Sequence, residues 1–481
     1  MIDESLKLPK KVIDMYGHII HIKDKPLGQG GQGVVCRTKD KNIALKLLVK
    51  DGKLVENKQE YAKYKERIND VSVLKIEDDI NICRPEIILQ EPLCGYVMKL
   101  LNDLSPVSEL IYTSIDGEYK DYLISDGNLK KRLEVLIDLA RVLARLHSKG
   151  MIYGDLSPYN VFYSKKDLFS KVWLIDCDNL HMHYEYVPTV FTPQYGAPEI
   201  IKETSANTQF SDCFSFAILA FKILTANHPF INDYNSESDS DGWDASETPN
   251  NNQSDIDAND VTWLCDKNSN APSDIINFIK RSVPHNLMDL FDSTFNEIGR
   301  NCPTTRPSMR TWFEALYYTY TKLWKCSCGT YNLYSHKTCL SCDSQQKIDR
   351  YCSIFSVYNK HVYNEALEEL KSSQQDNLFE EFPDNHGVFK DKDVILYDGM
   401  SLYNFDFENI CVYETPYPYI TFNIIKDALI VTNTGKVTCN YYTSDGKQAS
   451  LIDSIKINKG EKKLLSFYKD NVEYKQLLIV T

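Results

Sequence analysis

The sequence predicts a chain of the α+β class with more than one domain, and three observations lead to this expectation. Strand-like segments dominate about the first hundred residues, amphipathic helix-like segments follow, and short alternating runs return near the C-terminus. The 481 residues are enough for about two to four domains, each with its own core. The hydrophobic fraction of 43% and the charged fraction of 25% are those of an ordinary globular protein.

Composition also limits the compartment and the partners. We find no apolar run of bilayer-spanning length, and the start Met-Ile-Asp-Glu-Ser lacks the basic and apolar regions of a signal peptide. The 14 cysteines are scattered except for one tight group of four, which favours a reducing cytoplasm with one metal site. The net charge of −13 disfavours nucleic acid as a partner. We therefore expect a cytoplasmic protein with no membrane partner.

The stretch Met-Ile-Tyr-Gly-Asp-Leu-Ser-Pro-Tyr-Asn over 151–160 organises the interpretation of the chain. Asp155 and Asn160 follow an amphipathic segment and precede a strand-like one, and a second buried strand ends on Asp176. Two carboxylates and a carboxamide delivered from loops at strand ends are what phosphoryl transfer needs. One carboxylate orients a hydroxyl, and the other, with the amide, holds Mg²⁺ against the phosphates.

A glycine-rich loop precedes this stretch. Gly28, Gly30 and Gly33 match the pattern Gly-x-Gly-x-x-Gly, directly after the alternating segment 17–22. Glycines allow a hairpin backbone to lie close over phosphates, where any Cβ would obstruct it. A dinucleotide-binding motif requires a helix next. Here 42–48 reads as another strand, so we expect a hairpin.

Five further segments follow in order. The spacing of apolar residues over 130–149 predicts a core helix. Beyond Asp176 come Thr-Pro-Gln-Tyr-Gly-Ala-Pro-Glu at 192–199, Asp-Cys-Phe-Ser-Phe-Ala at 212–217, His-Pro-Phe at 228–230 and Arg-Pro-Ser-Met at 306–309.

In this order, the segments resemble those of protein kinases. The stretch around Asp155 is similar to the catalytic loop His-Arg-Asp-x-x-x-x-Asn, with Tyr153 and Gly154 in place of His and Arg. Asp176-Cys-Asp stands where kinases have Asp-Phe-Gly. The resemblance implies that Arg306 pairs with Glu199 of the Ala-Pro-Glu segment.

The resemblance also implies the domain organisation and the biology. We expect a bilobal protein-kinase fold over 1–320, with an N-lobe over about 1–98 and a C-lobe over about 102–320. Over about 18–320, the residue sequences of the motifs resemble those of a bacterial group of Ser/Thr kinases associated with tellurite-resistance-type stress operons. The implied function is a bacterial signalling kinase that phosphorylates a protein substrate. A phosphatase and a von Willebrand A-type protein are partners implied by such operons.

The resemblance further assigns roles to single residues, with ATP and Mg²⁺ (or Mn²⁺) as cofactors. Met98 takes the gatekeeper position, a reading compatible with a buried structural methionine. The implied catalytic residues are Asp155, Lys46, Glu60, Asn160 and Asp176, of which Asn160 and Asp176 bind Mg²⁺. The implied nucleotide-binding residues are Leu27, Gly28, Gly30, Gly33, Val35, Ala44, Lys46, Met98, Lys99 and Leu101.

Lys46 requires a carboxylate partner in this scheme, because an ion pair fixes its ammonium group for the phosphates. The charged, helix-prone segment 53–69 lies where kinases place the helix that supplies it. We choose Glu60, while Glu56 and Glu66 remain alternatives.

Several departures from the kinase pattern bear on the mechanism. Gly154 replaces the arginine that usually receives a phosphorylated activation loop, so we expect activity without such phosphorylation. Ser157 replaces a phosphate-binding lysine, and Asp178 replaces a glycine. Because of the last two changes, a pseudokinase adaptor that binds nucleotide without turnover remains the alternative function. A small-molecule kinase is disfavoured, because the segment 192–199 builds a platform for a protein substrate.

A cysteine cluster follows the kinase-like region. Cys326 and Cys328, then Cys339 and Cys342, form two knuckles that suit tetrahedral Zn²⁺ in a ribbon over 324–345. The segment resembles the Ran-binding-protein type of zinc finger, although its first knuckle is one residue short. Such fingers bind ubiquitin or single-stranded RNA or are structural, and the absence of a basic–aromatic run favours a structural or protein-docking ribbon. His336 is a spare ligand.

Three remaining segments complete the chain. An acidic stretch over about 231–270, without Lys or Arg between 232 and 260, predicts a solvated insert, with a docking strip for a basic partner as the alternative. Residues 346–380 read as a helical connector. Alternating runs broken by turns over 386–481 predict a C-terminal all-β module, a sandwich or a barrel, whose ligand the pattern does not indicate.

Overall fold

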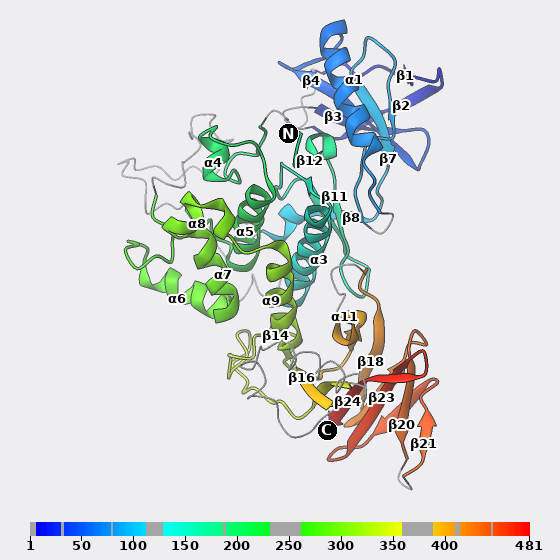
Figure 1. Ribbon diagram of the computed structural model, residues 1–481, viewed down its shortest axis with the longest axis vertical. Coiled ribbons are helices and arrows are strands. Elements are labelled where there is room, and N and C mark those ends of the chain that lie inside the picture. Colours follow the sequence, from blue (N-terminus) through cyan, green and yellow to red (C-terminus); the bar gives the residue numbers. More distant parts are fainter. Residues whose placement is uncertain are drawn as a thin grey trace, which may run out of the picture. The chain divides into compact units, whose positions relative to one another are not determined.

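The computed structural model describes residues 6–29, 33–77, 80–111, 128–185, 189–230, 261–357, 388–408, 414–443 and 446–481. The chain divides into two compact units. Unit 1 comprises Met1–Ile115 and Lys131–Leu316, and unit 2 comprises Asp116–Lys130 and Tyr317–Thr481 (Figure 1). Among the described helices, none combines the length and the apolar character needed to cross a bilayer.

Unit 1 begins with an antiparallel sheet in the order β1-β2-β3-β4-β7-β6, with β5 paired to β4. Side chains of a strand alternate between the two faces of a sheet. Leu45 and Leu47 therefore join one apolar cluster, and Ala44 joins another on the opposite face, where Lys46 also lies. The strands are β1 (Lys11–Ile13), β2 (Ile19–Gln29), β3 (Gly33–Thr38), β4 (Ile43–Lys50), β5 (Lys53–Leu54), β6 (Ile87–Ile88) and β7 (Gly95–Lys99).

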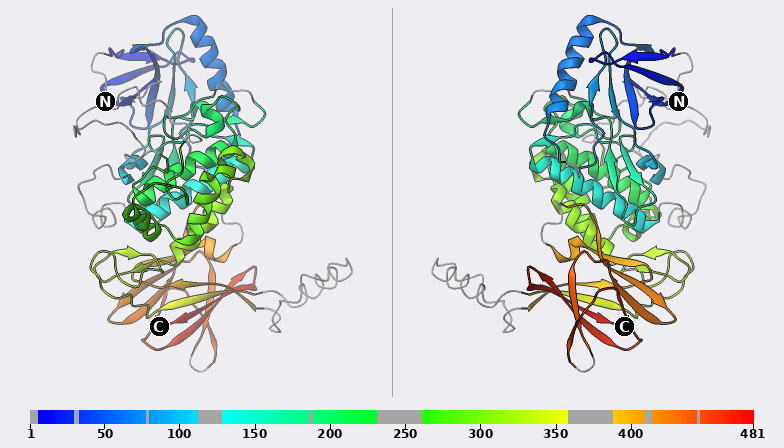
Figure 2. Two further views of the ribbon diagram at one scale, coloured as in Figure 1. Left: turned by 90° about the vertical axis from the view of Figure 1, so that its left-hand side faces the viewer. Right: turned by 90° about the vertical axis from the view of Figure 1, so that its right-hand side faces the viewer.

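One long helix, α1 (Lys58–Val73), packs beside this sheet (Figures 1 and 2). Its first turn is capped by Asn57, whose side chain accepts a hydrogen bond from the Glu60 amide at 2.8 Å. Ile68 belongs to the same apolar cluster as Ala44 of β4. The helix thus covers the face of the sheet that carries Lys46.

The rest of unit 1 is mainly helical. Helix α5 is buried along almost its whole length, and Phe221 of α5 contacts Phe291 and Phe295 of α7 edge to face. The helices are α3 (Leu129–Ser148), α4 (Pro198–Ile201), α5 (Gln209–Thr225), α6 (Ser273–Ser282), α7 (His285–Phe295), α8 (Glu297–Asn301) and α9 (Met309–Thr321). The 3₁₀ turns are η1 (Val107–Leu110), η2 (Cys177–Asn179) and η3 (Pro303–Thr305).

Two small antiparallel sheets carry the loops of the site. One has the order β11-β10-β8 and the other pairs β12 with β9. Their strands are β8 (Leu104–Pro106), β9 (Met151–Ile152), β10 (Val161–Ser164), β11 (Val172–Leu174) and β12 (His181–Met182).

The range predicted for the insert, about 231–270, includes residues that the structure places in the helical core. Residues 231–260 lie outside the described part of the chain, but Trp263 and Leu264 are each 1% exposed in the helical core. The Leu264 amide donates to the Pro229 carbonyl at 2.9 Å. The limit of 270 is therefore wrong, because two apolar side chains at 263–264 pack as core.

Two antiparallel sheets contain most of the described strands of unit 2. One has the order β16-β15-β24-β23-β20-β21 and the other β17-β18-β19-β22. A single cluster of buried side chains draws members from both sheets, such as Leu477 and Phe422. The elements are β15 (Tyr351–Val357), β16 (Val388–Ile395), β17 (Met400–Tyr403), α11 (Asn404–Phe407), β18 (Pro418–Ile425), β19 (Ala428–Asn433), β20 (Thr438–Tyr442), β21 (Gln448–Ser450), β22 (Ser454–Ile457), β23 (Lys462–Lys469) and β24 (Val472–Val480).

The predicted connector over 346–380 needs correction at its start. Residues 351–357 form β15, a strand paired to both β16 and β24, rather than a helix. Cys352 and Ile354 alternate into the shared core, which fits the period of a strand. The β-sheet region therefore begins before residue 386, and 358–380 lies outside the described residues.

Candidate active site

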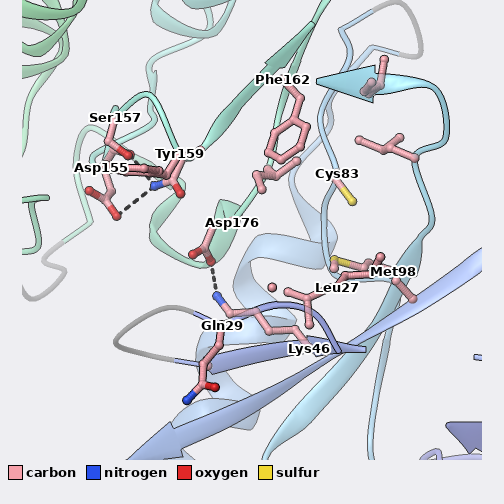
Figure 3. Close-up of a pocket in the computed structure, with 18 of the residues that line it drawn as sticks. Leu27, Gln29, Lys46, Cys83, Met98, Asp155, Ser157, Tyr159, Phe162 and Asp176 are labelled. Atoms are coloured by element: carbon pink, nitrogen blue, oxygen red, sulfur yellow. Dashed lines mark hydrogen bonds and ion pairs between the residues drawn. The ribbon is translucent and has the colours of Figure 1, made fainter. Parts of the chain in front are cut away.

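A cavity of about 740 Å³ lies in unit 1 between the N-terminal sheet and the loops of the two small sheets. Leu27, Gln29, Lys46 and Met98 enter it from the strands (Figure 3). Asp155, Asn160 and Asp176 enter it from the loops after β9 and β11. Residues that are far apart in the sequence thus meet in one cavity.

The expected nucleotide-binding residues that the structure describes line this cavity. Gly33 is pressed against the sheet, since a Cβ there would lie 2.8 Å from the Leu47 carbonyl oxygen. Gly30 lies outside the described residues. The remaining expected positions on the wall are Leu27, Gly28, Val35, Ala44, Lys46, Met98, Lys99 and Leu101.

The loop that carries Asp155 is held by its backbone. The amides of Tyr153 and Gly154 donate to the two carboxylate oxygens of Asp212, each at 2.9 Å. Gly154 has φ +85°, a conformation that an L-residue with a side chain adopts only at a cost. Glycine at 154 therefore suits the turn.

Two side chains orient the Asp155 carboxylate. The Thr192 hydroxyl donates to Asp155 Oδ1 at 2.7 Å, and the Asn160 amide donates to Oδ2 at 3.2 Å. Burial raises the pKa of Asp155, the hydrogen bonds from Thr192 and Asn160 lower it, and the nearby Asp176 raises it. Each carboxylate oxygen of Asp155 thus has its own side-chain donor.

Asp176 has a left-handed backbone conformation with φ 55°. Its carboxylate pairs with Lys46 (Figure 3). Burial raises the pKa of Asp176, Lys46 opposes this rise, and the Asp178 carboxylate adds to it. The pKa of Lys46 is raised, because Asp178 and Asp176 together outweigh the burial of the ammonium group.

The residues present fit a magnesium ion. Carboxylate and amide oxygens are the ligands that Mg²⁺ prefers. The amide nitrogen of Asn160 is engaged by Asp155, at 2.9 Å from its carbonyl oxygen, so the Asn160 side-chain oxygen is the atom left for a metal. Asn160 and Asp176 are therefore the residues that would hold the ion.

The expected pairing of Lys46 with Glu60 is wrong. Glu60 instead lies 3.7 Å from Lys50 Nζ, and the alternatives Glu56 and Glu66 are exposed. The reason is helical phase: on α1 the buried positions are Tyr61, Ile68 and Val71, and Tyr64 continues that line inward.

Asp178 is a second acidic partner of Lys46, beside Asp176. Its Oδ2 lies 2.8 Å from Lys46 Nζ. The sequence showed Asp178 only as a departure from Asp-Phe-Gly. Two features together could have indicated this partner: the additional acidic residue at 178, and the absence of an acidic residue among the inward positions of α1.

One further contact matches the motifs, and within the described part of the chain Ser157 makes none through its hydroxyl. Arg306 forms a bidentate ion pair with Glu199, at 2.7 and 2.8 Å, and the arginine is 4% exposed. Ser157 is 1% exposed, and its hydroxyl has no hydrogen-bond partner among the described residues.

The four cysteines of the predicted zinc ribbon lie close together in unit 2. Their Sγ atoms all lie within 4.8 Å of one another. The pairs Cys326–Cys342 and Cys328–Cys339 are each 3.6 Å apart, too far for disulfide bonds. A tetrahedral zinc site with Zn–S bonds of about 2.3 Å has sulfur–sulfur edges of about 3.8 Å, so the donors fit zinc. His336 lies outside this four-cysteine group.

Short contacts support the cysteine cluster. It is framed by β13 (Trp324–Lys325) and β14 (Tyr331–Asn332). The Asn332 amide lies 3.6 Å from Cys339 Sγ, and the Ser341 amide donates to the same sulfur at 3.4 Å. Donors aimed at a sulfur are what a thiolate ligand requires.

The donors around the cavity of unit 1 are those of a phosphotransferase that acts with a nucleotide and a divalent metal. Comparison with family models makes the class specific, because residues 21–318 match the model described as Protein kinase domain. The chain belongs to the protein kinase family.

Two curated relatives and one solved structure illustrate what the chain is similar to. The chain is 30% identical over 131 residues to serine/threonine-protein kinase pkn2 of Myxococcus xanthus, covering 25% of this chain and 16% of the relative. It is 29% identical over 228 residues to human ribosomal protein S6 kinase alpha-2, covering 43% and 27%. A solved ROP18 kinase domain in complex with AMP-PNP and sucrose aligns at 17% identity and a TM-score of 0.44, covering 65% of this chain and 83% of that one. The chain thus spans less than a third of the length of these two curated relatives.

Proposed function

We propose that this protein is a Mg²⁺- and ATP-dependent Ser/Thr protein kinase. The observation that carries the proposal is the Asp155 carboxylate, oriented by Thr192 and Asn160 at the edge of a cavity that also contains Lys46 and Asp176. A carboxylate fixed by two donors presents a defined face to an acceptor hydroxyl. The threonine contact favours a protein Ser/Thr substrate over a small molecule.

Each residue has a role in this proposal. Lys46 and the glycine hairpin orient the α- and β-phosphates, and Asp155 orients the acceptor hydroxyl and accepts its proton. Asn160 and Asp176 hold magnesium, which neutralises the charge that develops on the phosphates. Ser157 leaves one cation fewer near the transferred group than in kinases with lysine there.

The test is transfer of the ATP γ-phosphate with Mg²⁺ or Mn²⁺, to the protein itself and to a basic generic substrate. We expect phosphoserine or phosphothreonine from the wild type and loss of both in Asp155→Asn, which keeps the shape but removes the proton acceptor. ATP binding by the variant is the control for folding. Binding without transfer by the wild type would instead favour an adaptor pseudokinase, for which Ser157 and Asp178 are the supporting departures.

We also propose that the four cysteines bind one Zn²⁺ in a ribbon similar to the Ran-binding-protein type, with a structural or protein-docking role. The cysteines in the described residues are free thiols, which supports a reducing, cytoplasmic setting. The β-sheet region of unit 2 would then be a separate recognition module. Metal analysis of the purified protein tests the first step, with one zinc per chain expected.

The bacterial stress-operon group remains the proposed setting for this kinase. The relative in Myxococcus xanthus supports a bacterial Ser/Thr kinase. A phosphatase and a von Willebrand A-type protein are the partners proposed from that resemblance. Co-purification with either protein, measured against a variant without residues 231–260, would test both the partners and the acidic insert.

A further inference from the structure

One of the two carboxylates that pair with Lys46 comes from an unusual place. In protein kinases generally, the helix beside the N-terminal sheet supplies a glutamate to this lysine. Here α1 supplies none, and Asp178 of η2 lies 2.8 Å from Lys46 Nζ. Both side chains are largely buried, at 6% and 12% exposed. A buried ammonium needs such a partner, because an unpaired charge is costly away from water.

Asp178 is held in position by a second donor. The Tyr96 hydroxyl donates to Asp178 Oδ1 at 2.6 Å, while Oδ2 faces Lys46. Tyr96 itself is fully buried and stacks on Tyr64 of α1, with ring centroids 6.4 Å apart. Each carboxylate oxygen thus has its own partner, which fixes the orientation of the acid.

Helix α1 reaches the same segment through an arginine. Arg67 Nε donates to the Asp178 carbonyl oxygen at 2.8 Å, and Arg67 Nη2 donates to the Leu180 carbonyl oxygen at 3.2 Å. The guanidinium group of Arg67 therefore binds the backbone of the segment that carries Asp178. Tyr64, one turn earlier on the inward face, has a buried hydroxyl without a hydrogen-bond partner in the described part of the chain.

We propose that Asp178 is the positioning residue for Lys46, and that Arg67 connects α1 to Lys46 through it. This inference rests on the proposed kinase function and deepens it. Because Asp176 is the carboxylate expected at magnesium, Asp178 is the partner that stays available to Lys46 when nucleotide is bound. The lysine is thereby coupled directly to the metal-binding segment and only indirectly to the helix.

This arrangement is tested by removing the carboxylate at 178 and then supplying another carboxylate from α1. Asp178→Asn keeps the shape but removes the charge, and we expect ATP affinity and kcat to fall roughly 10-fold or more, as for other lost hydrogen bonds to charged groups. Asp178→Gly, which restores the usual kinase residue, should lose as much. Adding Tyr64→Glu to Asp178→Gly returns a carboxylate from the helix and should recover most of the loss. The matched control, Tyr64→Gln with Asp178→Gly, should recover nothing.

The readouts separate positioning from other roles. ATP affinity is measured by displacement of a fluorescent nucleotide, kcat by phosphate transfer, and folding by thermal melting. Unchanged affinity and kcat in Asp178→Asn would overturn the proposal. So would a higher Mg²⁺ requirement with an unchanged KM for ATP and no rescue by Tyr64→Glu, because that pattern belongs to a metal ligand.

Two further controls keep the outcome decisive. If Asp178→Asn fails to fold, Tyr96→Phe removes only the second donor to the acid and should weaken ATP binding several-fold, and no effect would overturn the proposal. If the wild type binds ATP but transfers no phosphate, the kinase proposal fails while the affinity measurements still decide the role of Asp178.

Discussion

The hydrogen bond from Thr192 to Asp155 leads to a prediction with a defined size. The 2.7 Å contact joins a hydroxyl to the carboxylate expected to orient the acceptor. A hydrogen bond to an ionised group contributes about 1.5–3 kcal/mol. Since each 1.36 kcal/mol is tenfold in rate, Thr192→Ala should lower kcat/KM for a peptide substrate on the order of 10- to 100-fold.

The pH dependence gives the prediction a sign. The Thr192 bond lowers the pKa of Asp155, against the burial that raises it. Its removal therefore raises the pKa of Asp155, so the acidic limb of the kcat/KM profile should move to higher pH. Thr192→Ser keeps the hydroxyl and should keep both the rate and the profile.

The controls also test regulation. Thr189, another hydroxyl of the same segment, is exposed. Because Gly154 replaces the usual arginine receptor for an activation-loop phosphate, Thr189→Ala should leave the rate unchanged. The reasoning is refuted if Thr192→Ser loses as much activity as Thr192→Ala. The expected independence from phosphorylation is refuted if Thr189→Ala loses activity and the wild-type protein is active only in its phosphorylated form.

Three other predictions concern stability, metal and nucleotide. Arg306→Met leaves the largely buried Glu199 carboxylate, which is 11% exposed, without its partner and should destabilise unit 1 by about 3–5 kcal/mol in urea unfolding, whereas a change below about 1 kcal/mol would mean that the pair acts like a surface pair. Cys339→Ser should abolish stoichiometric zinc in metal analysis of the purified protein, and retention of one zinc would exclude the four-cysteine site. Gly33→Ala places a Cβ 2.8 Å from the Leu47 carbonyl oxygen and should raise the KM for ATP about tenfold, with kcat measured at saturation as the control.

Much of the fold follows from local periodicity. The strand expected at 42–48 overlaps β4 but begins one residue before it and ends two residues short of its end, and the helix expected at 130–149 matches α3 to within one residue at each end. Both segments bury a face that their own spacing of apolar residues defines. The strand at 351–357 was missed because it lies next to a polar segment and its partners, β16 and β24, are remote in sequence. Pairing between distant strands leaves no mark on the local pattern.

The cavity shows a similar division. Motifs with fixed spacing predicted where Asp155, Asn160 and Asp176 would come together, because the loops that carry them are short. The partner of Lys46 depends instead on which face of α1 meets the sheet, and a shift of one residue along a helix turns a side chain by about 100°. Glu60 is one residue from the inward position Tyr61, and that single step directs it to Lys50.

The position of Asp178 shows that a family sequence pattern does not determine which element supplies the carboxylate beside Lys46. A kinase requires a carboxylate at Lys46 but not a particular element to supply it, since the Coulomb attraction depends on distance and burial. In this chain Asp178, two residues from the expected metal ligand Asp176, supplies such a carboxylate, and Arg67 of α1 binds the backbone there. A movement of α1 would therefore break backbone contacts before it broke the ion pair of Lys46. Control of such a kinase through this helix would act first on the segment at 178–180 and only through it on the lysine.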